Sequence, residues 1–495
     1  MRRPALPLLL GALALVPLSG CTGSSDPGGP AGPASGPGTS AEAPAVPGPP
    51  DDAALERAVD EPREDSVYPA TGDPGVDALH YDLALSWDPD ERVLDGRERL
   101  TLRATADDDT LQLDLSPALE VRSVRVDGRA VRHRHRGSDL VVRQRVVEDR
   151  RYEVVVAYRG TPRPVPAPTT RRDLDGLGWN TTDAGWTWTM QEPYGAHTWY
   201  AVNDHPSDKA FYDVTVSVPS PWTGVSNGAL VSREERDGRT VTQWRLAEPA
   251  AAYLMTLATG DYTDVHATSA TGVPVTWWVP RDRPELGGGA GTMARELSWL
   301  EERLGPYPYD TAGAVLVDST SGMETQTMIT LGMTDYALSP AVVVHELAHH
   351  WYGNQVTPED WRDVWMNEGM AMYLQVLWQA EHEGPSLDVL LDRYADREAV
   401  ARAEAGPPGA YDPRAFGQSN IYYGPMLMWH EVRERVAAES DDSAFWEMVR
   451  GWPASQEDAH ADREEHLAWV EDRTGLELSA LFDAWLMGET SPPRS

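Results

Sequence analysis

The sequence predicts a multidomain α+β protein, in which an N-terminal antiparallel, β-sandwich-like domain precedes a mainly helical domain with a small mixed sheet. Two patterns carry this prediction. Apolar and polar residues alternate in short segments between residues 80 and 256, whereas longer stretches with helical periodicity dominate after residue 290. The chain has 495 residues, which is long enough for two or three domains with cores of their own.

The N-terminus has the pattern of an export signal. Arg2 and Arg3 precede an apolar segment, 6–18, that is too short to cross a membrane as a mature helix. This segment leads into Leu-Ser-Gly-Cys, which ends at Cys21 and resembles a bacterial lipobox. We expect residues 1–21 to be a lipoprotein signal peptide, and the mature protein to be lipid-anchored at the outer face of the cell membrane. The alternative is a plain secretory signal with an incidental cysteine.

The next segment, 22–65, is rich in Gly, Pro, Ser and Ala and then in acidic residues. Such a composition buries too little apolar surface to offset the entropy of ordering, so the sequence predicts a disordered tether. The whole chain is strongly acidic, with a formal net charge of -36. Lys209 is its single lysine. Because a surface that binds phosphate needs clustered Lys and Arg, we expect no nucleic acid partner.

Residues 66–261 are predicted to form the β domain. Turn signals such as Asp127-Gly128 and Arg159-Gly160 separate the alternating segments. This regular spacing is typical of an all-β domain built from antiparallel neighbours. The predicted strands are 80–87, 98–102, 111–115, 121–126, 152–158, 211–218, 224–231, 241–246 and 252–256.

Residues 262–490 are predicted to form the second domain. An amphipathic helix is expected at 293–304, because Gly305-Pro306 follows it directly. Another is expected to start at Pro340, since the next proline is Pro358. The remaining elements are predicted strands at 273–279 and 314–318, and predicted helices in 364–374, from Pro385, and after Pro425.

The helix from Pro340 contains H-E-x-x-H. His345 and His349 are four residues apart, so both imidazoles project from one helix face and can bind one metal ion. The Glu346 carboxylate, next to the first histidine, can reach water at the metal. Zinc needs a third protein ligand and an open fourth position, and Glu368 on the next helix is the candidate. We therefore expect one Zn²⁺ per chain; the alternative is a helix whose histidines only pack or form hydrogen bonds.

The stretch HELAHHWYGNQVTPEDWRDVWMNEGMAMYL resembles the aminopeptidase N family of zinc metallopeptidases, the gluzincins. The pattern HYDLALSW, with the strands that follow it, is similar to the family's N-terminal β domain, so the resemblance runs from Tyr68 onward. It implies a thermolysin-like catalytic domain with zinc on His345, His349 and Glu368. It also implies Glu346 as general base and then general acid.

The resemblance also implies residues that bind the substrate. The S-G-M-E-T segment at 321–325 is similar to the family's G-x-M-E-N signature, whose glutamate binds the amino terminus of the substrate; here it is Glu324. Ser321 and Thr325 replace the Gly and Asn of that signature. Glu192 corresponds to a loop that reaches into the active site and helps to hold the substrate's amine.

A tyrosine completes the implied site. In the family it stands in a Y-x-K-G or Y-x-R-G context and donates a hydrogen bond to the developing oxyanion. The corresponding segment here, 416–425, has no Lys or Arg, and the strict count back from Gly424 reaches Ile421. A one-residue deletion brings Tyr422 into register, and Tyr423 is the other candidate.

Together these features favour a zinc-dependent aminopeptidase that acts outside the cytoplasm on peptides with a free N-terminus, with the membrane contacted only through a lipid anchor. Two alternatives stay open. A zinc endopeptidase has the same metal site but no use for Glu324. A scaffold lipoprotein with a degenerate site is compatible with the altered segments around Ser321 and Tyr422.

Overall fold

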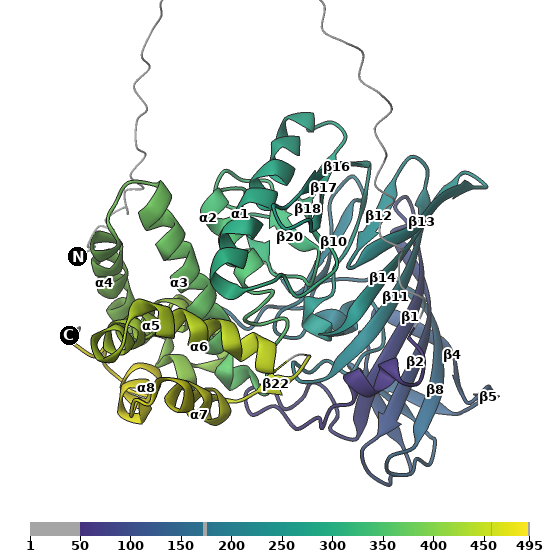
Figure 1. Ribbon diagram of the computed structural model, residues 1–495. Helices are drawn as coiled ribbons and strands as arrows, with labels where there is room; N and C mark the ends of the chain where they lie inside the picture. The colour runs from purple at the N-terminus through teal and green to yellow at the C-terminus, as the bar shows by residue number, and fades with distance from the viewer. Residues whose placement is uncertain (1–49, 172–175, 457, 494–495) are drawn as a thin grey trace, which may run out of the picture. The chain divides into compact units, whose positions relative to one another are not determined.

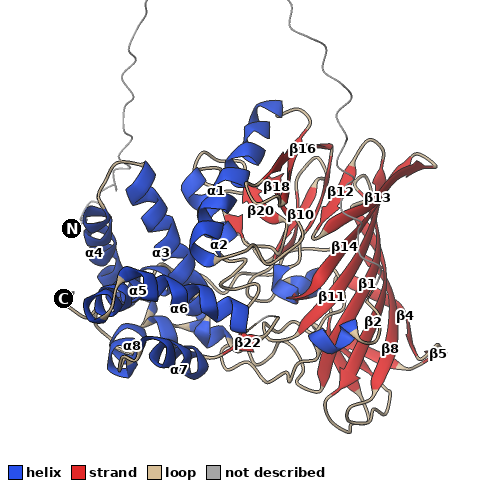
Figure 2. Ribbon diagram, viewed as in Figure 1, coloured by secondary structure: helices blue, strands red, loops and turns tan. Residues whose placement is uncertain are grey.

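The computed structural model describes residues 50–171, 176–456 and 458–493. Strands dominate the chain as far as Gly260, and helices dominate its second half (Figures 1 and 2). The predicted fold class, a mainly-strand N-terminal domain followed by a helical domain, is confirmed. The predicted signal peptide, Cys21 and the first part of the predicted tether, residues 22–49, lie outside the described residues.

An eight-stranded sheet is the largest element of the β domain. Its neighbouring strands are antiparallel, except that β1 and β11 run parallel, with His80 opposite Phe211. The prediction of antiparallel pairing misses this pair, because alternation in a sequence shows which face a residue occupies and not the direction of the neighbouring strand. In spatial order the strands are β13 (Ala229–Arg236), β14 (Arg239–Ala251), β11 (Lys209–Pro219), β1 (Val76–Asp88), β2 (Val93–Ala104), β8 (Arg151–Gly160), β4 (Leu119–Val126) and β5 (Arg129–Ala130).

Two smaller sheets share one apolar core with the large sheet. Trp87 and Trp179 illustrate the contact, with ring centroids 5.1 Å apart. Aromatic pairs of this kind contribute about 0.5–1.5 kcal/mol beyond the area they bury. The small sheets are β12 (Thr223–Ser226), β15 (Leu257–Gly260), β10 (Thr187–Met190) and β9 (Gly178–Thr181), and β3 (Leu111–Asp114), β7 (Asp139–Val142) and β6 (His133–Arg136).

Residues 252–256, predicted as a strand, instead contain a 3-10 turn, η3 (Ala252–Leu254). The side chain of Gln191 explains the difference, because its Nε2 donates to the carbonyls of Ala252 and Met255, each at 2.7 Å. A side chain thus occupies acceptors that a continuing strand would offer to a neighbour.

The predicted tether is wrong for its last part. Residues from Asp51 on have a described fold, and η1 (Ala54–Ala58) buries Leu55 against the β domain. Asp65 is buried and accepts hydrogen bonds from the backbone amides of Tyr68 and Trp361. Acidic composition alone suggested a solvated segment, but here a carboxylate satisfies buried donors and connects the two domains.

The second domain contains the small mixed sheet that the sequence predicts. Its order is β16 (Tyr262–Thr268), β17 (Pro274–Pro280), β18 (Ala312–Val317), β20 (Ile329–Gly332) and β19 (Gly322–Met323). The central pairs β17–β18 and β18–β20 are parallel and the outer pairs are antiparallel. Helix α1 (Gly289–Leu304) packs against β16 and β17 (Figure 2).

Helix α3 contacts α2, α4 and α5, whereas α6 and α8 contact α5, and α7 contacts α6 (Figure 1). Within the described residues, no helix is both long enough and apolar enough to cross a bilayer. The helices are α2 (Pro340–Ala348), α3 (Trp365–His382), α4 (Leu387–Ala405), α5 (Asn420–Glu439), α6 (Asp442–Ser455), α7 (Arg463–Thr474) and α8 (Ser479–Leu486). Short elements elsewhere in the described residues are η2 (Ala196–Thr198), η4 (Pro284–Gly288), β21 (Thr357–Pro358), η5 (Trp361–Asp363), η6 (Pro408–Ala410), η7 (Pro413–Ala415) and β22 (His460–Ala461).

The single lysine of the chain lies buried where the β domain meets the helical domain. Lys209 starts β11, and its Nζ donates to the carbonyls of Asn354 at 3.1 Å, Gln355 at 2.9 Å and Ala459 at 2.8 Å. An ammonium group has three donors, so these carbonyls satisfy it fully. Burial lowers the pKa of Lys209 to about 8. The lysine therefore fixes the backbone that follows α2 against the β domain.

We expect Lys209→Met to lower the free energy of unfolding by about 2–4 kcal/mol, because the variant leaves buried carbonyls without donors. Urea unfolding measures the change. Arg236→Met is the matched control, since the Arg236 side chain is 72% exposed, and it is expected to change the free energy of unfolding by less than about 0.5 kcal/mol. Equal effects of the two substitutions would contradict the role of Lys209.

Candidate metal centre and active site

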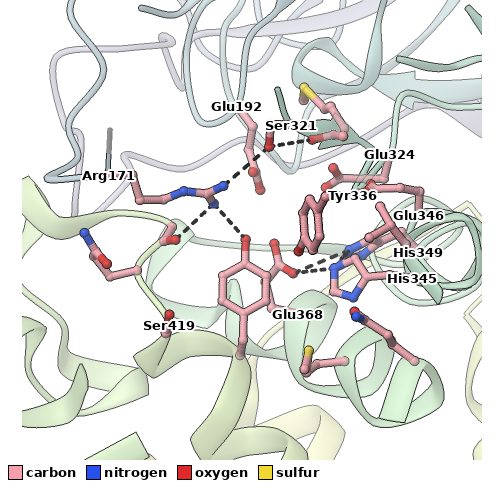
Figure 3. Close-up of a pocket in the computed structure, with 18 of the residues that line it drawn as sticks. Arg171, Glu192, Ser321, Glu324, Tyr336, His345, Glu346, His349, Glu368 and Ser419 are labelled. Atoms are coloured by element: carbon pink, nitrogen blue, oxygen red, sulfur yellow. Dashed lines mark hydrogen bonds and ion pairs between the residues drawn. The ribbon is translucent and has the colours of Figure 1, made fainter. Parts of the chain in front are cut away.

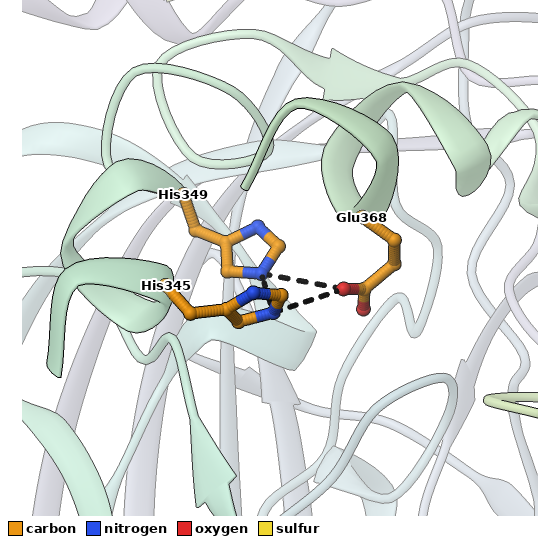
Figure 4. Close-up of side chains that lie close together, drawn as sticks. All are labelled: His345, His349 and Glu368. Atoms are coloured by element: carbon orange, nitrogen blue, oxygen red, sulfur yellow. Dashed lines mark hydrogen bonds and ion pairs between the residues drawn. The ribbon is translucent and has the colours of Figure 1, made fainter. Parts of the chain in front are cut away.

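Helix α2 ends at the two histidines of H-E-x-x-H. Ser339 caps its N-terminus by accepting from the Val342 amide, and Pro340 takes the first helical position. His345 lies in the last turn and His349 at the C-cap. Because residues four apart share a helix face, their Nε2 atoms lie 3.2 Å from each other (Figure 4).

Glu368 approaches the same point from the first turn of α3. Its Oε2 lies 3.3 Å from Nε2 of His345 and 3.5 Å from Nε2 of His349 (Figure 4). Tetrahedral ligands at about 2.0–2.1 Å from zinc are about 3.4 Å apart. The donor set of two imidazoles and one carboxylate, all buried, therefore fits one zinc ion and leaves a fourth position for water or substrate.

The charges around the two histidines and Glu368 also favour the binding of a cation. Burial lowers the pKa of His345 and opposes the charge on His349, yet Glu324 and Glu368 raise the pKa of His349 to about 10. Burial opposes ionisation of Glu368, but His349 and His345 outweigh it and hold the pKa of that carboxyl below its ordinary value. The ligand carboxylate is thus ionised, as coordination of a metal requires.

Glu346 lies beside the three ligands without belonging to the set. Burial raises the pKa of its carboxyl, which suits a group that exchanges a proton near neutral pH. Gly322 of β19 makes room for it, because a Cβ there would lie 2.4 Å from Oε1 of Glu346. The sequence alone gave no reason for a glycine here, and the position of the Glu346 carboxylate explains it.

Two further carboxylates reach the same cavity from different domains (Figure 3). Glu324 follows β19, and its backbone carbonyl accepts from Nδ2 of Asn354 at 2.7 Å. Glu192 follows β10, next to the anchored Gln191, and its Oε1 is buried with no hydrogen-bond partner. Burial, and then the charge of Glu324, raise the pKa of Glu192. Both predicted amine-binding residues are thus brought together where an ammonium group would satisfy them.

The structure distinguishes the two tyrosines. Both lie in the first turn of α5, so the prediction that this helix begins after Pro425 is wrong, because the helix starts at Asn420 and contains Pro425. The Tyr422 ring stacks on His345, with centroids 5.9 Å apart and an interplanar angle of 23°. The Tyr423 ring instead packs on Tyr394, with centroids 4.9 Å apart. Of the two, Tyr422 has the position to act beside the metal ligands.

The cavity that these residues line has a volume of about 520 Å³, a size common for sites that bind small ligands. Two other residues that line the cavity could not be predicted from the sequence. Arg171 enters from the loop between β8 and β9, and Tyr336 from the loop between β20 and α2 (Figure 3). Neither belongs to a motif, and each comes close only through the tertiary fold.

Known proteins resemble this chain along most of its length. A model of the Peptidase M1 N-terminal domain matches residues 77–254, and a model of the Peptidase family M1 domain matches residues 290–405. Glutamyl aminopeptidase of Sus scrofa is 28% identical over 222 residues, which are 41% of this chain and 24% of that protein. Probable aminopeptidase 1 of Sulfurisphaera tokodaii is 25% identical over 331 residues, 62% of this chain and 40% of that protein.

The chain therefore spans between about a quarter and two fifths of the length of these curated relatives. One solved structure resembles this chain over a larger share of both chains. It is a mutant of an M1 zinc metallopeptidase from Deinococcus radiodurans bound to a Tyr-Ser-Ala substrate, with a TM-score of 0.76 and 26% identity. The match covers 87% of this chain and 98% of that one.

Removal of a ligand is expected to abolish zinc binding. After dialysis against zinc, the wild-type protein should hold one equivalent, whereas His349→Ala and Glu368→Ala should hold less than about a tenth of one. Zinc should also raise the melting temperature of the wild type, because it binds the folded state. Elemental analysis and thermal unfolding measure both effects.

Glu346→Gln is the control for this experiment, and it should keep one equivalent of zinc. The ligand atoms of Glu324, Glu346 and His349 also lie within 4.8 Å of one another, so they form a second possible set. Loss of zinc from Glu346→Gln with retention in Glu368→Ala would show that this second set holds the metal.

Proposed function

Because the chain belongs to peptidase family M1, we propose that it is a zinc-dependent aminopeptidase, which removes the first residue from peptides with a free amino terminus. One observation carries the proposal. Glu192 and Glu324, from separate domains, face the cavity that contains the metal ligands. A substrate ammonium bound by these carboxylates places the first peptide bond beside Glu346. An endopeptidase has no use for such a pair at the end of its cleft.

The side chains have separate tasks in this reaction. When bound, zinc supplies a Lewis acid that lowers the pKa of water and polarises a carbonyl group. Glu346 accepts the proton of the attacking water and then delivers it to the leaving amine. Tyr422 donates a hydrogen bond to the negative charge that develops on the carbonyl oxygen. Glu324 and Glu192 hold the ammonium group through charge-assisted hydrogen bonds.

The proposed location is outside the cytoplasm, with Cys21 carrying a lipid anchor. The support is the sequence of the N-terminus, where Arg2 and Arg3 precede the apolar segment 6–18 and the Leu-Ser-Gly-Cys pattern. In a bacterium that processes lipoproteins, the wild-type chain should sediment with membranes and incorporate labelled fatty acid. Cys21→Ala should incorporate none; equal labelling of both chains would contradict the anchor.

The activity is tested with a panel of aminoacyl anilides, each with a free or an N-acetylated amine. We expect the wild type to release the chromophore from the free amines only. Glu346→Gln should lower kcat by about 10²–10⁴-fold, the usual contribution of general acid–base catalysis. Glu324→Gln should lower kcat/KM by about 10–100-fold, because the neutral amide can still accept a hydrogen bond but lacks the charge that strengthens binding of an ammonium group.

Cleavage of the acetylated substrates would instead favour the endopeptidase and remove the proposed role of Glu324. A protein that holds zinc and cleaves neither the anilides nor longer unblocked peptides would favour the scaffold lipoprotein. Zinc content measured on the same sample separates these outcomes from simple loss of the metal.

A further inference from the structure

Two departures from the expected sequence pattern meet at one side chain. Ser321 stands where the signature has glycine, and the segment around Tyr422 has no lysine or arginine. Arg171, from the loop between β8 and β9, lies beside Ser321 (Figure 3) and contacts both positions. Its Nη2 donates to Oγ of Ser321 and its Nη1 to the hydroxyl of Tyr422, each at 3.4 Å. Nη1 also donates to the carbonyl of Gly417 at 3.1 Å.

The chemistry of the guanidinium fixes the direction of these bonds. Arginine has donors and no acceptor, so the Tyr422 oxygen must accept, and its own hydrogen must point elsewhere. The Tyr422 ring stacks on His345, and both residues line the cavity, where the carbonyl oxygen of a bound substrate can accept this hydrogen. The hydroxyl of Ser321 accepts from Arg171 in the same way, and it donates its own hydrogen bond to the carbonyl of Gly322 at 3.4 Å.

The positive charge of Arg171 also favours donation of a hydrogen bond by the Tyr422 hydroxyl. Nη1 of Arg171 lies 3.4 Å from the Tyr422 hydroxyl oxygen, close enough for its charge to polarise the O–H bond. A cation next to a hydrogen-bond donor strengthens donation to a developing negative charge.

We propose that Arg171 is a positioning residue, which holds the Tyr422 hydroxyl so that its hydrogen is donated to the oxyanion. It supplies from the β domain the positive charge that is missing from the sequence around the tyrosine. The inference rests on the proposed aminopeptidase function, since it assigns a task within that reaction. It also makes the β domain a contributor to catalysis, because the guanidinium connects that domain with Ser321, which precedes β19, and with Tyr422 of α5.

The test compares Arg171→Gln, Arg171→Lys, Tyr422→Phe and the double variant Arg171→Gln/Tyr422→Phe, all as zinc-loaded full chains. On a free aminoacyl anilide, Arg171→Gln should lower kcat by about 10–100-fold and change KM by less than about threefold, the pattern of an interaction made in the transition state. Arg171→Lys should recover part of kcat. The double variant should be no more than about twofold slower than Tyr422→Phe, because the arginine acts through the tyrosine.

Arg163→Gln is the matched control, since Arg163 is exposed on the same loop, and it should keep wild-type kinetics. Losses from Arg171→Gln and Tyr422→Phe that multiply in the double variant would overturn the inference. So would an Arg171→Gln variant with wild-type kcat. Unchanged zinc content and melting temperature show that each variant is folded.

A binding measurement keeps this inference distinct from the proposed function. A dipeptide phosphonate carries a tetrahedral anion that resembles the oxyanion, and its affinity needs no turnover. If the wild type fails to cleave the anilides, the proposed function fails, yet non-additive losses of phosphonate affinity in the same variants would still support the link between Arg171 and Tyr422. Additive losses would overturn it.

Discussion

Negative charge at the metal centre is the constraint on which the rest of the structure depends. Glu192, Glu324, Glu346 and Glu368 line one cavity and are wholly or partly buried, and burial raises the pKa values of the first three. An ionised carboxylate removed from water without a counter-charge costs of the order of several kcal/mol. The guanidinium of Arg171 lies in the same cavity, and a zinc ion and the ammonium of the proposed substrate would offset more of this charge, so we expect the stability of the site to increase when cations bind.

The backbone that follows α2 keeps the histidines in place, and donors from distant segments hold this backbone. Lys209 donates to the carbonyl of Asn354, and the Tyr253 hydroxyl donates to that of Gly353 at 2.7 Å. Asn354 in turn donates to the carbonyl of Glu324. Because a buried carbonyl without a donor costs about 1–3 kcal/mol, these bonds specify one arrangement of the metal-binding helix against the β domain. The β domain is therefore part of the scaffold of the site.

The sequence predicts those parts of the fold and the site that depend on local spacing. The four-residue period identifies His345 and His349, and one returning helix is enough to bring Glu368 to them. Strands follow from alternation, although the parallel pairing of β1 and β11 does not. Arg171 could not be predicted, because 251 residues separate it from the tyrosine that it contacts. Asp65 was missed for a similar reason, since its acceptor role depends on amides that only the fold brings near.

The altered residues around Glu324 argue against a degenerate site, because each has a defined place in the structure. Ser321 accepts from Arg171, and the buried hydroxyl of Thr325 donates to the carbonyl of Met328 and lies 3.1 Å from that of Thr330. The Thr325 bonds close the turn that follows Glu324, which lines the cavity. A protein that only binds a partner has no physical reason to keep several carboxylates together against their desolvation and mutual repulsion. Such a cluster is stable where cations offset it, and a metal ion beside an ammonium group is the combination that an aminopeptidase brings to its site.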